Sequence, residues 1–199
     1  MNGRMGIGFS AGNKALYNKA TFLRLRERDD SEMGRAINAF RVALVNKYVP
    51  PERRVLDIGP GALTFMKARG NCLAFDINPH AIAILKRQHE WFDLYNDSFS
   101  VKRIAGVTFF DSLEHITNPA LILNRIGNQP IIVSLPIFWN KKHCMNSKHF
   151  KPGEHLWYFT HRSFLQYMAG LGFEMLEERN DERNMGRESI KTFVFKRTA

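Results

Sequence analysis

Cysteine is scarce in this chain of 199 residues, which contains only Cys72 and Cys144. Two cysteines cannot form the disulfide framework of a small secreted protein, so we expect a reducing, cytoplasmic environment. Residues 1–20 hold no apolar core of the kind found in signal peptides. The most apolar stretch, residues 131–139, is interrupted by Pro136 and is too short to cross a bilayer. We therefore expect a soluble protein with no membrane partner.

Extremes of composition are missing too. The chain is 44% hydrophobic and 24% charged, with 14 Gly and 8 Pro, which excludes collagen-like, disordered and coiled-coil proteins. A chain of this length is expected to fold as one domain with a sizeable core.

Acidic residues are few relative to basic ones: 19 Asp and Glu stand against 29 Lys and Arg, for a net charge of +10. Residues 1–54 carry 11 basic and 5 acidic residues, residues 55–140 carry 7 of each, and residues 141–199 carry 11 and 7. The excess positive charge therefore flanks a neutral centre. A basic surface attracts polyanions such as nucleic acid or nucleotides, although it also serves solubility alone.

The apolar pattern changes near residue 30. Residues 1–30 show little periodicity, so we expect an irregular basic arm there and a single domain over residues 31–199. Strand-like runs lie near 55–58, 72–75, 93–95, 106–110 and 131–135, and helical runs lie between them and at 161–171. This alternation predicts an α/β fold with a doubly wound, mostly parallel sheet and helices on both faces. Two runs near 173–177 and 191–195, with no room for a helix between them, predict an antiparallel hairpin at one edge.

Residues 140–160 form a long stretch without clear periodicity between a strand and a helix. Structureless segments of this length inside a compact domain tend to be functional. The stretch interleaves lysine and histidine with aromatic residues, so we expect a lid over a substrate site, although Trp157 and Phe159 equally suit anchoring in the core.

The sharpest motif is Asp57-Ile58-Gly59-Pro60-Gly61, which follows a strand-like run. Glycines at this point let the backbone turn tightly and approach a ligand. Asp76 ends the next strand-like run, where a carboxylate can accept hydrogen bonds from both ribose hydroxyls of a nucleoside cofactor.

Two nucleoside cofactors suit such a layout. A dinucleotide site needs a third small residue where Thr64 stands, and the Asp57 carboxylate would repel a pyrophosphate. S-adenosylmethionine carries a sulfonium and an amino group and no phosphate, so it is the favoured cofactor. The alternatives are a glycine turn without a ligand and, less favoured, a nicotinamide dinucleotide site.

The sequence resembles the class I S-adenosylmethionine-dependent methyltransferases. The matching stretches follow the family's order over roughly residues 50–199 and lie at 55–61, 75–79, 110–119, 132–136 and 154–160. The resemblance implies a Rossmann-like, seven-stranded sheet with a reversed hairpin at its edge. It also implies that a methyl group moves from the cofactor to an oxygen or nitrogen atom.

The resemblance further assigns parts of the cofactor to residues. Gly59 and Gly61 would pass beneath the methionine part, Asp76 would hold the ribose, and Ile77 would pack on the adenine. Phe110 and Asp111 would line the side of methyl transfer. The expected cofactor residues are Asp57, Gly59, Gly61, Asp76, Ile77, Asp97, Phe110 and Asp111, with Asp97 facing the adenine amino group. The sequence departs from the family at Leu63, where a third Gly is frequent, and in the short connection from Asp97 to Gly106.

Asp111, Glu114 and His115 follow a strand-like run, and His155 comes later in the chain. Small-RNA 2′-O-methyltransferases carry a similar set that binds a divalent metal, whereas enzymes resembling those of quinone biosynthesis share the signature with no metal implied. We expect His115 or His155 to act as a general base, with Glu114 beside them. A divalent metal on Asp111, Glu114, His115 and His155 is the less favoured alternative, and a structural role is the third.

The acceptor is the least determined part. The basic flanks favour an anionic acceptor such as RNA, DNA or a nucleotide. The alternatives are a small-molecule methyltransferase with a more apolar pocket and a non-catalytic module that binds nucleic acid or a partner protein.

Overall fold

The computed structural model describes residues 17–94, 96–100 and 102–198. Its strands are β1 (Arg54–Ile58), β2 (Cys72–Phe75), β3 (Ile104–Phe110), β4 (Ile131–Phe138), β5 (Phe159–Thr160), β6 (Phe173–Arg179) and β7 (Ile190–Arg197). Its helices are α1 (Lys19–Asp30), α2 (Glu32–Tyr48), α3 (Thr64–Arg69), α4 (Pro79–Arg87), α5 (Pro119–Leu123), α6 (Lys141–Asn146), α7 (His161–Gly170) and α8 (Asp181–Asn184). A short 3-10 turn spans Leu113–His115.

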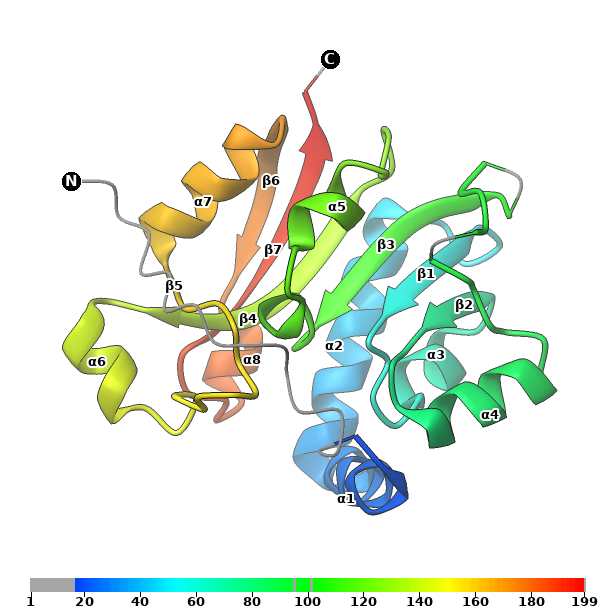
Figure 1. Ribbon diagram of the computed structural model, residues 1–199, viewed down its shortest axis with the longest axis horizontal. Coiled ribbons are helices and arrows are strands. Elements are labelled where there is room, and N and C mark those ends of the chain that lie inside the picture. Colours follow the sequence, from blue (N-terminus) through cyan, green and yellow to red (C-terminus); the bar gives the residue numbers. More distant parts are fainter. Residues whose placement is uncertain (1–16, 95, 101, 199) are drawn as a thin grey trace.

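The strands form one seven-stranded sheet in the order β2-β1-β3-β4-β7-β6, and β5 pairs with the far end of β4 (Figure 1). β1 runs parallel to β2 and β3, and β3 runs parallel to β4. β7 pairs antiparallel with both β4 and β6. The expected mostly parallel sheet with an antiparallel edge hairpin is therefore confirmed, with a single turn of helix, α8, inside the hairpin.

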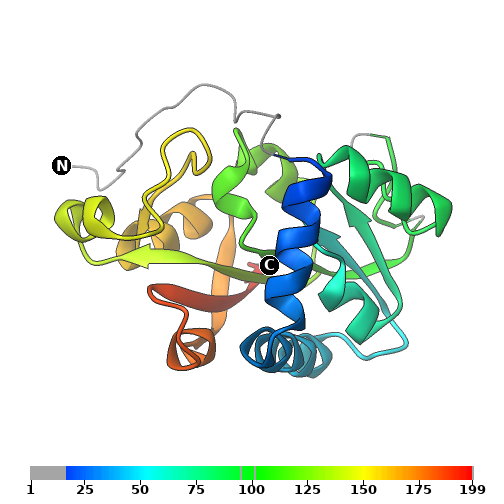
Figure 2. The same ribbon diagram turned by 90° about the horizontal axis from the view of Figure 1, so that it is seen from below.

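Helices cover both faces of the sheet (Figure 2). Successive strand residues alternate between the two faces. Leu56 belongs to the core cluster that includes Phe164 of α7, and Val55 belongs to the one that includes Leu44 of α2. All eight residues of β4 are buried, as expected of a strand covered on both sides. Among the helices in the described part of the chain, none combines the length and the apolar character needed to span a membrane.

The segment before residue 31 corrects one expectation. Residues 19–30 form helix α1 rather than an irregular arm, and residues 1–16 lie outside the described part of the chain. The Asn18 side chain begins the helix by accepting a hydrogen bond from the backbone N–H of Thr21. Phe22 is the one buried side chain of α1. Because a single apolar contact creates no periodic stripe, the sequence pattern did not reveal this helix.

Three further boundaries differ from the expectation. Residues 140–160 contain helix α6, which Asn140 caps, and the short strand β5. No strand forms at 93–95 among the residues described there; instead Trp91 makes an isolated bridge to Ala74. The helical run expected between 106–110 and 131–135 forms the short helix α5, which ends at Leu123.

Candidate active site

The carboxyl ends of the parallel strands bring the predicted cofactor residues together. Gly59 follows β1, and its N–H donates to the Phe75 carbonyl at the end of β2, 2.9 Å away. Gly59 has a φ of +73°, and an added Cβ would lie 2.6 Å from the Cβ of Ser112. Glycine is therefore required at position 59 both for the backbone conformation and for the contact with the loop after β3.

Asp57 and Asp76 are both buried acceptors at this edge. The Asp57 carboxylate accepts a hydrogen bond from the Thr108 hydroxyl, 2.7 Å away, and burial raises its pKa to about 7. Burial also raises the pKa of Asp76 to about 6, against the effect of backbone N–H groups of residues 78, 77 and 61 that donate to it. Each carboxyl group therefore titrates close to neutral pH, where a ligand donor or positive charge would favour its ionised form.

Leu63 lies in the glycine loop with a φ of 65°, in the left-handed region. This conformation is costly for leucine and free for glycine, which explains in physical terms why the resembled family often has Gly there. Leu63 is buried in the core, so its apolar contacts offset the strain.

The other predicted cofactor residues differ in placement. Ile77, after β2, is 48% exposed, which leaves an apolar side chain open at the sheet edge. Phe110 is buried, with its ring edge-on to Phe65 at 4.9 Å between centroids. Asp97 belongs to a separate turn, where its carboxylate accepts from the Asp93 N–H and lies 3.5 Å from the Lys102 ammonium. Among the described residues, no contact joins the Asp97 side chain to the strand-end loops.

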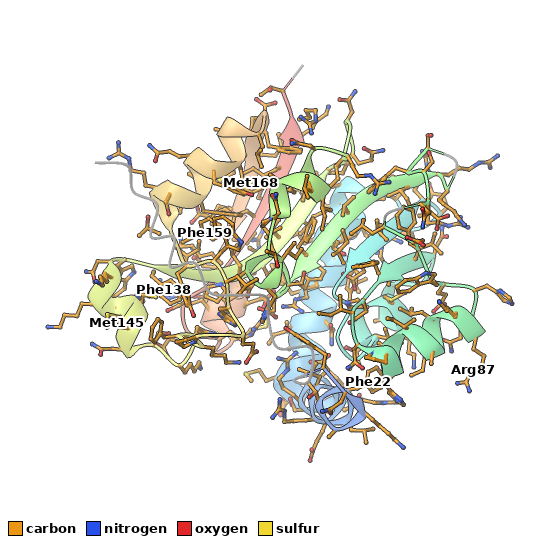
Figure 3. The ribbon with its side chains drawn as sticks, viewed as in Figure 1. Phe22, Arg87, Phe138, Met145, Phe159 and Met168 are labelled. Carbon is orange, nitrogen blue, oxygen red and sulfur yellow. The ribbon has the colours of Figure 1, made fainter. Side chains whose placement is uncertain are left out.

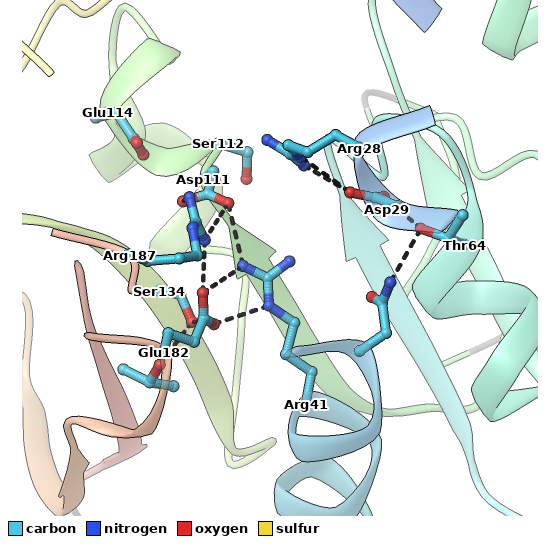
Figure 4. A network of polar contacts seen from close by, with 12 residues as sticks. Arg28, Asp29, Arg41, Thr64, Asp111, Ser112, Glu114, Ser134, Glu182 and Arg187 are labelled. Atoms are coloured by element: carbon cyan, nitrogen blue, oxygen red, sulfur yellow. Dashed lines mark hydrogen bonds and ion pairs between the residues drawn. The ribbon is translucent and has the colours of Figure 1, made fainter. Parts of the chain in front are cut away.

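Asp111 belongs to a buried ion network that the sequence analysis missed (Figure 4). Arg187 donates to both of its carboxylate oxygens at 2.9 Å, and Arg41 donates at 3.1 Å. Glu182 accepts from Arg41, Arg187 and the Ser134 hydroxyl. Burial would raise the pKa of Asp111, but the two guanidinium groups outweigh it and hold that pKa well below its usual range.

Beside this network, α1, α2 and Arg187 border a small, open recess. Its charged lining residues are Arg28, Asp29, Arg41 and Arg187. Arg41 is only 7% exposed. Its Nε and one terminal nitrogen donate hydrogen bonds to the carboxylates of Glu182 and Asp111. Within the described part of the chain, no group accepts a hydrogen bond from its second terminal nitrogen, which Figure 4 shows turned toward Arg28.

Glu114, His115 and His155 form a second buried cluster. Their ligand atoms lie within 4.8 Å of one another. The Glu114 carboxylate is 4.0 Å from Nε2 of His115, and the two imidazole rings meet edge to face at 4.6 Å between centroids. Oε2 of Glu114 and Nδ1 of His155 are buried with no hydrogen-bond partner among the described residues. Asp111, the fourth residue of the predicted metal set, is not part of this cluster, and both of its carboxylate oxygens accept hydrogen bonds from Arg187.

Burial favours the neutral form of both histidines. Burial lowers the pKa of His155 to about 3 and also lowers that of His115, while it raises the pKa of Glu114 to about 8. Nδ1 of His115 lies 3.0 Å from the Glu154 carbonyl, which can only accept a hydrogen bond. Donation to this carbonyl requires the tautomer with its proton on Nδ1, in which Nε2 keeps the lone pair on the side of Glu114. Tyr17, another residue that the sequence analysis missed, brings its hydroxyl within 3.1 Å of the same Nδ1.

Two segments distant in sequence cover the site. The backbone N–H groups of Leu156 and Trp157 donate to the Glu114 carbonyl, which fixes the end of the predicted lid against the loop after β3. Helix α1 lies against the glycine loop, where an added Cβ at Gly61 would be 3.5 Å from Leu25, and its Phe22 packs edge-on to His80 at 4.9 Å. The Asn78 amide also donates to the carbonyl of Asn18. The site is therefore enclosed from both the N-terminal side and the 140–160 side.

Comparison with known proteins agrees with this geometry. A family model described as a methyltransferase domain matches residues 25–178. The SAH-bound magnesium protoporphyrin IX methyltransferase of Synechocystis PCC 6803 is similar with a TM-score of 0.63 and 12% identity, over 93% of this chain and 98% of that one. A methyltransferase in complex with the Haloferax volcanii Trm112 activator is similar with a TM-score of 0.62 and 12% identity, over 94% of this chain and 97% of that one. The small RNA methyltransferase HEN1 is similar with a TM-score of 0.59 and 13% identity, over 83% of this chain and 25% of that one.

Curated protein sequences give no match. The solved structures share the fold at low identity, while the family model spans most of the chain, including both acidic strand ends. The chain therefore belongs to the methyltransferase-domain family, within the class I S-adenosylmethionine-dependent methyltransferases.

Proposed function

We propose that this protein transfers the methyl group of S-adenosylmethionine to an oxygen or nitrogen atom of an anionic acceptor. The observation that carries the proposal is the meeting of two left-handed glycines, Gly59 and Gly61, with the buried carboxyl groups of Asp57 and Asp76 at one sheet edge. An NAD site is disfavoured because Asp57 would face a pyrophosphate there.

The residues present fit the cofactor at each end. Asp76 would accept from the ribose hydroxyls, and the exposed Ile77 would pack on the adenine, with Asp97 as a further adenine contact from its own turn. The unpaired terminal nitrogen of the buried Arg41, with Arg28 beside it, suits the methionine carboxylate. When bound, S-adenosylmethionine supplies an electrophilic methyl group on its sulfonium.

The chain's own contribution to the reaction is alignment and proton acceptance. Phe110 and Asp111 would form one wall beside the transferred methyl group, and α1 with residues 151–157 would exclude water. In the tautomer with its proton on Nδ1, Nε2 of His115 would accept the proton of an acceptor hydroxyl. Glu114 and the neutral His155 border that nitrogen.

A divalent cation on Glu114, His115 and His155 is a second candidate. It is favoured by the two buried donor atoms of this cluster that lack a hydrogen-bond partner. Elemental analysis of untagged protein tests it: near-stoichiometric metal, lost in His155→Ala, would support the cation. Absence of metal, together with methyl transfer that resists EDTA, would assign the cluster to proton transfer.

Calorimetric titration with S-adenosylhomocysteine, with NAD in parallel, tests the donor half. We expect micromolar binding of S-adenosylhomocysteine alone, weakened about tenfold or more by Asp76→Ala. Arg28→Gln should also weaken it, whereas Arg26→Gln, on the same helix, serves as the matched control. Thermal melts of each variant separate lost binding from lost folding.

Either of two results would overturn the donor assignment. Unchanged affinity in Asp76→Ala would show that the ribose assignment is wrong. No binding of either nucleoside ligand by the wild-type protein would favour a non-catalytic module on this fold.

A further inference from the structure

We propose that Trp139, stacked on His143 and followed in sequence by exposed lysines, is a docking site for single-stranded nucleic acid. The inference rests on the proposed function, because it names the polyanion that would present the acceptor. The residues concerned are called the β4–α6 platform below: Trp139, Lys141, Lys142, His143, Met145 and Lys148.

The platform is an ordered projection with its own small core. Beyond Phe138 the chain turns into α6, whose first turn is capped by Asn140. Phe138, Cys144 and Tyr158 are buried against one another, apart from the two main core clusters. Figure 3 shows Phe138 and Met145 at the end of the molecule that α6 occupies in Figure 1. The exposed side chains above this core are therefore carried on a rigid support.

The Trp139 side chain is exposed to solvent and is not packed in the core. It is 74% exposed, more than any other large hydrophobic residue in the described part of the chain. Its ring stacks on His143 at 4.7 Å between centroids with 17° between the planes. The backbone N–H of Trp139 donates to Nδ1 of His143, 3.3 Å away, which holds the imidazole in place. One face of the indole is thus supported, and a planar base can stack on the other.

The charge around Trp139 selects the ligand class. Residues 139–153 contain four lysines and no acidic residue. Lys141 and Lys142 begin α6 and are exposed, and Lys148 is exposed with Glu188 no nearer than 4.0 Å. A planar aromatic face flanked by ammonium groups suits the bases and phosphates of a single strand. A protein partner would be expected to bury a broader apolar surface than one indole and Met145 provide.

The platform is joined to the active site along the chain. From Lys148 the chain passes through His149, whose ring lies 6.5 Å from that of His155 with 21° between the planes. Lys151 then pairs with Glu154, the residue whose carbonyl contacts His115. A strand stacked on Trp139 would therefore run along basic residues toward the histidine pair.

Binding of a fluorescein-labelled single-stranded RNA of mixed sequence, followed by anisotropy at low salt, tests the proposal. We expect Trp139→Ala to weaken binding about tenfold and Trp139→Phe, which keeps an aromatic face, to restore most of it. Leu121→Ala, which truncates another exposed apolar residue on α5, is the matched control and should leave affinity unchanged.

The lysines are tested by the salt dependence. Replacing Lys141 and Lys142 together by Gln should reduce the slope of log affinity against log salt by about 1.4, since each phosphate contact on a single strand contributes about 0.7. The matched control replaces Lys67 and Lys196, at exposed positions elsewhere, by Gln. This double change should reduce the slope of log affinity against log salt less.

Two outcomes would overturn the inference: no binding of RNA by the wild-type protein, or equal affinity in the wild type and Trp139→Ala. Selective capture of a protein through Trp139 without RNA binding would assign the platform to a protein partner instead. Titration of the same variants with S-adenosylhomocysteine keeps the two proposals separate. A loss of S-adenosylhomocysteine binding would concern the donor site alone.

Discussion

At the scale of single residues, the carboxyl groups of this site differ in ionisation because their neighbours differ. Asp111 faces two guanidinium groups and stays charged, whereas Asp57 has one hydroxyl donor and no direct ion pair. Burial without a paired charge disfavours the carboxylate, so the pKa of Asp57 rises to about 7 from its ordinary value of 3.8. This difference makes Asp57 a source of pH-dependent stability.

Asp57→Asn should flatten the pH dependence of the free energy of unfolding. Between pH 4 and 7 the folded wild type keeps a proton that the unfolded chain has lost, so its stability is full below pH 4 and falls as pH rises through 7. Asparagine retains an acceptor for Thr108 without the charge. The variant should therefore gain relative stability on the order of 4 kcal/mol by pH 8.

Urea unfolding at several pH values measures this, with the exposed Glu174→Gln as control. Parallel stability curves for wild type and Asp57→Asn would show that Asp57 ionises normally in the folded protein.

The candidate site contains residues that the sequence points to and residues that only the fold brings together. Asp57, Gly59, Gly61 and Asp76 belong to short motifs at strand ends, so local sequence suffices to find them. Arg41 and Glu182 are 141 positions apart, and only the topology of the sheet brings them together around Asp111. Neither position stands out in the sequence, because the residue type alone does not show whether an arginine or a glutamate is buried or exposed to solvent.

At the scale of elements, the position of α1 depends on its close contact with α2 at Gly34. An added Cβ at Gly34 would lie 2.4 Å from the Arg28 carbonyl oxygen and 2.6 Å from the Cα of Asp29. Both are backbone atoms, so the helices would have to move apart. The junction thus determines how closely α1 rests on the glycine loop.

Gly34→Ala should therefore destabilise the protein by about 1–3 kcal/mol and loosen α1. Limited trypsin digestion should cut faster at the arginines of α1, which the thermal melt alone would not reveal. Gly170→Ala is the matched control, because no atom lies within 4 Å of its added Cβ at the end of α7. Equal digestion of the two variants would argue against the junction's role.

The predicted lid shows how element prediction fails for short segments. α6 has six residues and β5 has two, too few for a periodic pattern to emerge. The capping residue Asn140 was the available local signal. Enclosure of the site by the end of this segment could not be read from sequence, since it depends on backbone hydrogen bonds to Glu114.

At the scale of the whole molecule, the fold followed from the alternation of strands and helices because both faces of the sheet need cover. The net charge of +10 has a separate consequence. Polyanion affinity of the intact protein should fall steeply and linearly in log salt, because binding releases counterions.

Anisotropy titrations of single-stranded RNA across a salt series measure this slope, with an uncharged-backbone analogue as control. Salt-independent affinity would show that the positive charge serves solubility rather than binding.

The position of β7 has a consequence for synthesis. β7 lies between β4 and β6, yet it follows all other strands in sequence. A nascent chain that has emerged only through β6 therefore presents an uncovered edge of β4, whose residues are Ile131–Phe138. Such an edge is a template for wrong pairing with other chains. The interval before β7 inserts is therefore when the risk of such pairing is greatest.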